Sequence, residues 1–142
     1  MKRAYPEYPV CAVGAMIIKD RKILLVRRGQ PPAFGKWSIP GGVVQLGETL
    51  EEAVIREARE ETGLEVRPLR IGKVVERIYR DTESRIEYHY IILDYVCEIL
   101  GGTLQAGSDA SAVDLVVFES LDELDLTEGT AEVIREVFRE ES

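Results

Sequence analysis

The sequence predicts an α+β domain, an α/β sandwich in which a mixed β-sheet lies between two helices. Strand-like apolar runs occupy residues 10–18 and 22–28, and further runs follow residue 64. Two other segments, residues 50–62 and 127–141, carry apolar residues at helical spacing. This order of strands, helix, strands and helix is typical of a sheet covered by helices.

The first part of the chain predicts a β-hairpin followed by a loop. Residues 19–21 form a polar turn between the two apolar runs, so we expect these runs to pair. Arg27 and Arg28 end the second run and project from opposite faces of the strand. Either is a candidate phosphate ligand, because arginine forms bidentate pairs with phosphate oxygens, and a solvent-facing arginine is the alternative. Trp37 ends the following loop and either stacks on a ligand or packs at the base of the loop.

The helix predicted at residues 50–62 has clear signals at both ends. Thr49 is a good N-cap, and Glu52 three residues later completes a capping box. Gly63 stands where helices commonly end in a left-handed turn. A glycine-rich turn at residues 40–42 precedes the helix.

One stripe of this helix changes from apolar to acidic along its length. Leu50, Val54, Glu57 and Glu61 share the stripe, and Glu60 lies beside Glu57. Three carboxylates therefore converge at the C-terminal end of the helix, where the helix dipole disfavours negative charge. A bound divalent cation removes this conflict, because carboxylate oxygens are ligands that Mg²⁺ prefers.

A solvent-exposed face is the alternative interpretation of part of this pattern. Glu52, Arg56 and Glu60 step by four, so opposite charges alternate along one face as on many surface helices. Glu57 and Glu61 lie on the apolar stripe, and for these two residues we favour a metal site.

The second half of the chain predicts three more strands and the second helix. The strand-like runs are residues 64–79, 85–100 and 113–118, and the nearly continuous apolar stretch in the second run indicates a central strand. The expected buried stripe of the helix at residues 127–141 consists of Val133, Ile134, Val137 and Phe138.

Length and composition indicate a single domain at residues 1–142, which we expect in the cytoplasm. No apolar run approaches the ~20 residues of a membrane span, and no signal-peptide pattern precedes the first strand. Cys11 and Cys97 both lie in apolar runs, so buried thiols are expected rather than a disulfide. A net charge of −8 argues against a nucleic-acid polymer as partner, because affinity for such polymers depends on Lys and Arg.

The segment from the glycine-rich turn to the end of the first helix resembles the Nudix box. Gly42, Glu48 and the run REAREETGL at residues 56–64 fill every fixed position of that pattern. The resemblance covers most of the chain, from Val10 to residues 121–124 before the last helix. It implies the Nudix fold and a metal-dependent pyrophosphohydrolase that acts on a nucleoside diphosphate linked to another group.

The resemblance also implies roles for individual residues. Arg56 is expected to orient a glutamate by an ion pair, and Glu48 to support the site. The expected ligands of Mg²⁺ or Mn²⁺ are the side chains of Glu57, Glu60 and Glu61 and the carbonyl group of Gly41. The candidates for substrate binding are Arg27, Arg28, Trp37 and Gly42. An acid outside the box often serves as base or ligand, and the candidates are Glu83, Glu87, Asp109 and Asp114.

The substrate is left open between three classes of small nucleotide. The layout is similar to the short ADP-ribose pyrophosphatase-like group, but Tyr79 stands where those enzymes often have a proline. A tyrosine in this region is typical of dinucleoside polyphosphate hydrolases. In a mutator-type nucleoside triphosphate pyrophosphatase, Thr127, Glu128 or Thr130 would read the base, although helix capping also explains the two threonines. We favour ADP-ribose or a similar nucleoside diphosphate sugar, because a compact acidic site with few basic neighbours suits two phosphates.

Two further expectations concern catalysis and assembly. A non-catalytic, nucleotide-sensing Nudix-like domain is the alternative from another class, and the complete set of box acids argues against it. Many members of the ADP-ribose group are homodimers, and long apolar strands are compatible with an edge that a second copy covers. A homodimer is therefore expected.

Overall fold

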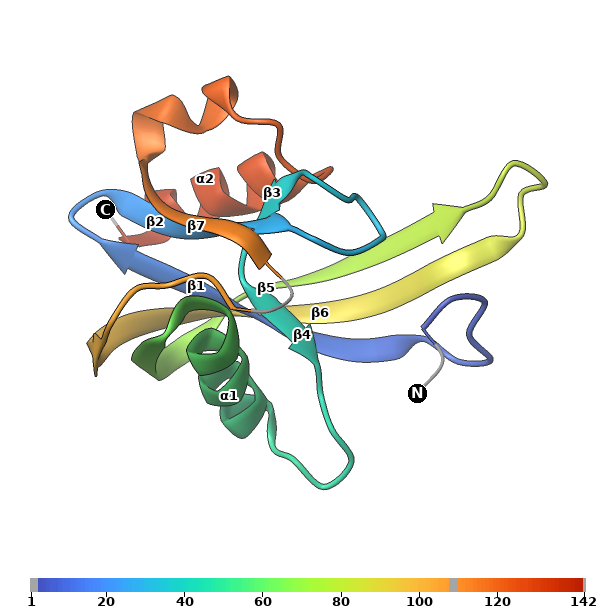
Figure 1. Ribbon diagram of the computed structural model, residues 1–142, viewed down its shortest axis with the longest axis horizontal. Coiled ribbons are helices and arrows are strands. Elements are labelled where there is room, and N and C mark those ends of the chain that lie inside the picture. Colours follow the sequence, from blue (N-terminus) through green and yellow to red (C-terminus); the bar gives the residue numbers. More distant parts are fainter. Residues whose placement is uncertain (1–2, 108–109, 142) are drawn as a thin grey trace.

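The computed structural model describes residues 3–107 and 110–141 of the chain. Its fold confirms the predicted α+β class, with a mixed sheet and helices on both sides (Figure 1). The elements are β1 (Val10–Lys19), β2 (Lys22–Arg28), β3 (Trp37–Ser38), β4 (Gly41–Val43), α1 (Leu50–Thr62), β5 (Leu64–Arg80), β6 (Ile86–Gly102), β7 (Ala110–Val117), the 3-10 helix η1 (Phe118–Glu123) and α2 (Thr130–Glu141).

Strand β1 is the centre of the sheet. It runs parallel to β6, with Val10 opposite Tyr90 and Ile17 opposite Cys97, and antiparallel to β4. The expected hairpin between β1 and β2 forms only at its closed end, where Ile18 faces Ile23. Beyond that point β2 leaves β1 and pairs with β3 and β7 instead. The two halves of the sheet therefore separate, and this separation opens space next to β1.

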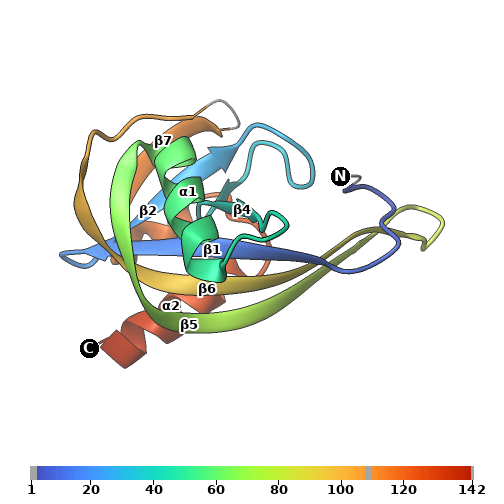
Figure 2. The ribbon, with the colours of Figure 1, turned by 90° about the horizontal axis from the view of Figure 1, so that it is seen from below.

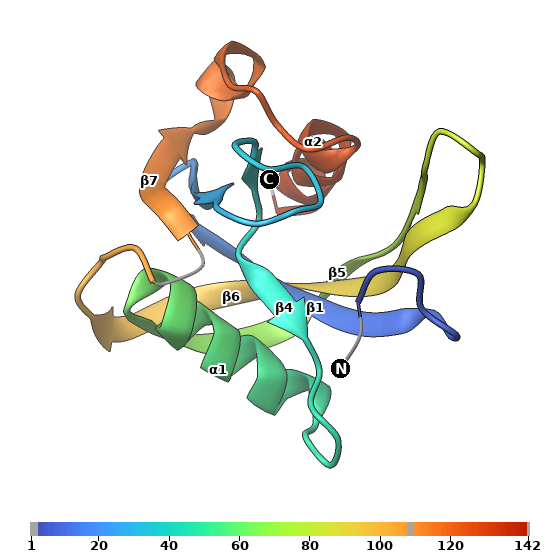
Figure 3. The ribbon, with the colours of Figure 1, turned by 45° about the vertical axis from the view of Figure 1, so that its right-hand side comes forward.

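The two helices cover opposite faces of β1 and β6 (Figures 2 and 3). Because side chains alternate along a strand, Val13, Ala15 and Ile17 of β1 pack in the core under α1, whereas Met16 packs in the core under α2. The predicted buried stripe of α2 is confirmed, since Val133, Ile134, Val137 and Phe138 are all buried.

Three details differ from the sequence-based expectations. Helix α2 begins at Thr130 rather than at residue 127, because Gly129 adopts a φ of +79° that no helix continues through. The strand expected at residues 85–100 extends to Gly102, which pairs with Leu64 at the end of β6. Cys97 is buried as expected, but Cys11 is exposed although it lies on the same face of β1 as Val13 and Ala15, and both thiols are free.

Strands β5 and β6 form a long antiparallel hairpin that extends beyond the rest of the molecule (Figure 1). Strand β6 lies between β1 and β5, as predicted for a central strand. Strand β5 is at the edge and exposes several large apolar side chains, among them Val74 and Ile78. Neither helix in the described residues has the length and apolar character needed to cross a membrane.

Candidate active site

Helix α1 has the ends that its sequence predicts. The Thr49 hydroxyl accepts a hydrogen bond from the Glu52 backbone N–H, and the Glu52 carboxylate accepts one from the Thr49 N–H. Gly63 ends the helix with a φ of +77°. The apolar stripe between these caps packs in the core at Val54, and this orientation leaves Glu57 and Glu61 lining a cavity beside β4.

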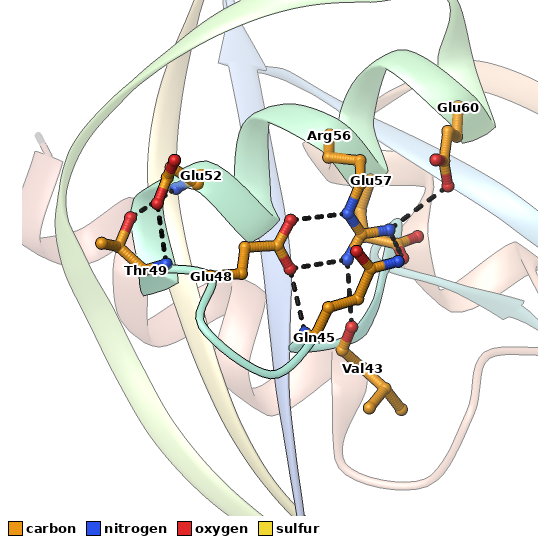
Figure 4. Close-up of polar contacts among 8 residues, drawn as sticks. All are labelled: Val43, Gln45, Glu48, Thr49, Glu52, Arg56, Glu57 and Glu60. Carbon is orange, nitrogen blue, oxygen red and sulfur yellow. Dashed lines mark hydrogen bonds and ion pairs between the residues drawn. The ribbon is translucent and has the colours of Figure 1, made fainter. Parts of the chain in front are cut away.

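Arg56 holds the loop before the helix and two carboxylates together (Figure 4). Its Nε and Nη2 donate to the two carboxylate oxygens of Glu48 at 2.7 and 2.9 Å, and its Nη1 donates to Glu57 at 2.7 Å. Nη2 also donates to the Val43 carbonyl at 3.1 Å. The Arg56 guanidinium lowers the pKa of Glu48 to about 2, and Glu48 in turn raises the pKa of Arg56. Glu48 and Arg56 therefore remain charged near neutral pH.

The glycine-rich turn is shaped by contact with two glutamates of α1. A Cβ atom on Gly42 would lie 2.4–2.6 Å from the carboxyl atoms of Glu57, so only glycine fits there. The Gly41 N–H donates to Glu61 Oε2 at 3.2 Å. Burial raises the pKa of Glu57, and Arg56 opposes this effect. A cation close to Glu57 and Glu61 would offset the cost of holding two carboxylates at this turn.

Glu60 lies apart from the other two predicted metal ligands. Its side chain is 59% exposed, compared with 12% for Glu57, and it accepts a 3.4 Å hydrogen bond from Arg56. Within residues 3–107 and 110–141, no three potential metal-ligating side chains are already gathered in one group. Glu57 and Glu61 fit a divalent cation in their chemistry, because both carboxylates line the cavity at one turn and carboxylate oxygens are ligands that Mg²⁺ prefers.

A cavity of about 610 Å³ extends from these carboxylates across the face of β1 and β6. It lies where the two halves of the sheet separate, and the loop after β2 and the segment before α2 form its other walls. The described residues that carry charge or a side-chain hydroxyl in its lining are Arg3, Arg28, Ser38, Glu57, Glu61, Arg77, Tyr79, Tyr90, Asp94, Thr127 and Thr130.

The structure separates the predicted substrate-binding residues into two groups. Gly42 and Arg28 line the cavity, and Arg28 Nε also donates to the Pro32 carbonyl at 2.6 Å. Arg27 is exposed and lies outside the described lining, so the opposite faces of β2 decide which arginine can reach a substrate. Trp37 is likewise outside this lining and packs against the core under α2.

The candidate acids beyond the box lie away from the cavity where they can be placed. Glu83 is in the exposed turn between β5 and β6, and neither Glu87 nor Asp114 belongs to the described lining. Asp109 lies outside the described residues. Thr127 and Thr130 do line the cavity, and their hydroxyl groups are hydrogen-bonded to each other.

Asp94 is a cavity residue that the sequence analysis did not select. It lies in the middle of β6 and is only 4% exposed. Burial raises its pKa to about 6, against the opposing charge of Arg77. The signal was present in the sequence, because Asp94 is the one charged residue in the apolar stretch YIILDYVC.

Comparisons with known proteins agree with one another. A family model described as NUDIX domain matches residues 9–140. An ADP-ribose pyrophosphatase of Methanocaldococcus jannaschii is 39% identical over 119 residues, which cover 82% of this chain and 67% of that protein. The match with a MutT-like protein of Streptomyces ambofaciens has 31% identity and covers 83% of this chain and 70% of that protein. A crystal structure of a MutT NUDIX hydrolase from Burkholderia pseudomallei matches with a TM-score of 0.81 and 28% identity, and covers 92% of this chain and 99% of that chain.

Proposed function

This chain belongs to the NUDIX family and is a Nudix pyrophosphohydrolase, and on this premise we propose that it cleaves ADP-ribose or a similar nucleoside diphosphate sugar. The products are a nucleoside monophosphate and a sugar phosphate, because water adds to one phosphorus while the bridging P–O bond breaks. The relative from Methanocaldococcus jannaschii, described as an ADP-ribose pyrophosphatase, supports this assignment.

The charge balance of the cavity carries the choice of substrate. Among the described lining residues, three arginines (Arg3, Arg28 and Arg77) stand against three carboxylates (Glu57, Glu61 and Asp94). This lining offers no surplus of positive charge for a long polyphosphate. A diphosphate that ends in a neutral sugar needs less neutralisation than a triphosphate or tetraphosphate does, so it suits the cavity better.

Nudix hydrolases generally use divalent metal ions, and we propose Mg²⁺ or Mn²⁺ here. The proposed ligands are Glu57, Glu60 and Glu61 with the Gly41 carbonyl. The bound cation supplies charge neutralisation at the phosphates and lowers the pKa of water. Arg56 and Glu48 position Glu57 by the hydrogen bonds described above.

Other residues of the cavity are proposed to bind the substrate and to exclude water from it. Gly42 leaves room for the Glu57 carboxylate to lie directly against the glycine-rich turn. Arg28, on the opposite wall of the cavity, is the proposed phosphate contact. Binding in the cavity of about 610 Å³ would remove part of the nucleoside from water, which strengthens each of these electrostatic interactions.

A mutator-type activity on oxidised nucleoside triphosphates is the second candidate. The observation that favours it is the position of Thr127 and Thr130, which line the cavity at the start of α2. The two hydroxyl groups are hydrogen-bonded to each other, and Thr130 is buried. The threonines therefore also have a structural role at the start of α2.

The test is a comparison of kcat/KM for ADP-ribose, a dinucleoside polyphosphate and an oxidised deoxynucleoside triphosphate under common Mg²⁺ and salt. We expect ADP-ribose to have the highest value. A preference of tenfold or more for the oxidised triphosphate would overturn the charge argument and direct attention to Thr127 and Thr130.

A further inference from the structure

Asp94 is placed in the cavity by the register of two parallel strands. It lies opposite Gly14 of β1, and Gly14 in turn lies opposite Gly41 of β4. Adjacent strands are about 4.8 Å apart, so the backbone of Asp94 is about 10 Å from the glycine-rich turn. Asp94 therefore lines the cavity two strands away from the turn that contacts Glu57 and Glu61.

Gly14 provides the space that the Asp94 carboxylate occupies. A Cβ atom on Gly14 would lie 2.0 Å from Asp94 Oδ1 and 3.2 Å from its Cγ. Any other residue at position 14 would push this side chain out of place. The carboxylate thus rests on the bare backbone of β1, next to Ile39, with its open side toward the cavity.

Among the described residues, no side chain forms a hydrogen bond or a close ion pair with the buried Asp94 carboxylate. The residue across from it on β5, Lys73, donates instead to Glu136 of α2 at 3.1 Å. Arg77 acts on Asp94 only through its charge. Ser38, on the other wall of the same cavity, has a buried hydroxyl that also lacks a hydrogen-bond partner in the structure. Buried polar groups normally have partners, so the open position next to Asp94 calls for a ligand.

We propose that Asp94 determines the base specificity of this enzyme by accepting a hydrogen bond from the exocyclic amino group of a purine. This inference rests on the proposed function insofar as the cavity must hold a nucleotide. With a phosphate at the glycine-rich turn, the group that reaches Asp94 is separated from that phosphate by the ribose, and this group is the base. A carboxylate is an acceptor for N–H donors, and an amino-bearing purine edge presents them.

Specificity would arise because a base without the amino group leaves the Asp94 carboxylate without a hydrogen-bond donor. A base without the amino group enters the same space but leaves the carboxylate buried and without a donor. Sites built to hydrogen-bond one substrate group reject analogues that lack it much more strongly than apolar pockets reject a change in size. Ser38 is a candidate second contact, because its hydroxyl can donate to a ring nitrogen or accept from an N–H group.

The first test uses the unmodified enzyme with Mg²⁺ and compares binding of AMP with binding of purine riboside 5′-monophosphate, which lacks only the amino group. We expect AMP to bind at least about tenfold more tightly, in the range of a hydrogen bond to a charged group. Equal affinities would overturn the proposal. GMP and IMP form the second pair, and a preference for GMP alone would assign the site to the amino group of guanine.

The second test uses Asp94→Leu, which keeps the branched shape and removes both acceptor oxygens. The preference for the amino-bearing nucleotide should fall to about onefold, while the melting temperature of the ligand-free protein stays the same or rises. Asp114→Leu is the matched control, because it removes an exposed strand carboxylate that lies outside the described lining of the cavity. A lower melting temperature with an unchanged AMP preference would show that Asp94 is structural, and would overturn the proposal.

These measurements separate this inference from the proposed substrate. If ADP-ribose is not hydrolysed but the AMP preference is present and depends on Asp94, the substrate assignment fails and the inference stands. If ADP-ribose is hydrolysed but both monophosphates bind equally well, the inference fails and the substrate assignment stands.

Discussion

Arg56 and Glu48 form a bidentate ion pair in which Nε and Nη2 of the arginine donate to both carboxylate oxygens of the glutamate. The pair joins helix α1 to the loop before it, and the remaining nitrogen of Arg56 donates to Glu57. The side chains are 20% and 13% exposed, so this contact is much less screened by water than a surface ion pair. The orientation of Glu57 therefore depends on a residue that itself need not touch substrate.

Arg56→Lys should lower stability by about 1–3 kcal/mol, because lysine keeps the charge but cannot reproduce the fork of hydrogen bonds to Glu48, Glu57 and the Val43 carbonyl. Urea denaturation measures the loss. Arg59→Lys is the matched control, since Arg59 pairs with Glu65 at exposed positions, where solvent screens the pair and we expect a clearly smaller loss of stability. Equal losses in both variants would show that the Arg56 network contributes no more than a surface pair.

Glu61→Gln should reduce turnover by at least about a hundredfold, the range expected for loss of a key catalytic group. The ligand-free protein should melt no lower than the wild type, because the amide can still accept from the Gly41 N–H. The two measurements are kcat and the melting temperature without added metal. A collapse in stability with unchanged activity per folded molecule would assign Glu61 to structure alone.

Millimolar Mg²⁺ should raise the melting temperature of the wild type, because it binds the folded carboxylates and not the unfolded chain. The rise should be absent in the double variant Glu57→Gln, Glu61→Gln. Excess chelator should abolish hydrolysis, and undiminished turnover in chelator would exclude a role for a metal ion.

The stability difference between wild type and Asp94→Leu should depend on pH. Burial raises the folded pKa of Asp94 to about 6 from an ordinary value of 3.8, so the folded protein binds more protons than the unfolded chain between these values. The wild type should therefore lose stability relative to the variant as pH rises from 4 to 7, by at most about 3 kcal/mol. Arg77 reduces this cost, whereas Lys73 is paired with Glu136. Denaturation curves at several pH values measure the effect, and a constant difference would contradict the assignment.

We also propose a homodimer that covers the exposed apolar face of the β5–β6 hairpin. Val74, Ile78 and Ile91 are exposed on this face, and β5 is the edge of the sheet. Sedimentation should give about twice the chain mass of 16.0 kDa for the wild type. Ile78→Lys should give a monomer, while Leu46→Lys, at an exposed apolar residue elsewhere, should not. A wild type that sediments as a 16.0 kDa species at micromolar concentration would rule out the dimer.

The local elements could be predicted from the sequence because their signals are local. The capping box at Thr49 and the glycine at position 63 set the ends of α1, and the periodicity of the helix placed Val54, Glu57 and Glu61 on one inward stripe. The spacing of Glu52, Arg56 and Glu60 also indicated the outcome for Glu60, which is exposed and pairs with Arg56 one turn away, as the surface-face interpretation expects.

The walls of the cavity could not be predicted in the same way, because they depend on strand pairing across the chain. The parallel register that brings Asp94 over Gly14 has no signal in either segment alone. The alternation of β2 likewise leaves Arg27 and Arg28 equivalent until the face next to the cavity is known. Cys11 was expected to be buried, and it is exposed because α1 covers only part of the sheet.

The parallel pairing of β1 with β6 also affects the order in which contacts can form during folding. The glycine-rich turn and α1 are adjacent in sequence, so their contacts close short loops and can form early. Strand β6 is synthesised long after β1, and contacts between such distant segments are slow to form. Until β6 docks, Gly14 faces no carboxylate and the deep wall of the cavity does not exist. The proposed nucleotide site therefore requires that β6 has paired with β1. The hydrogen bonds of Arg56 require only residues from the first half of the chain.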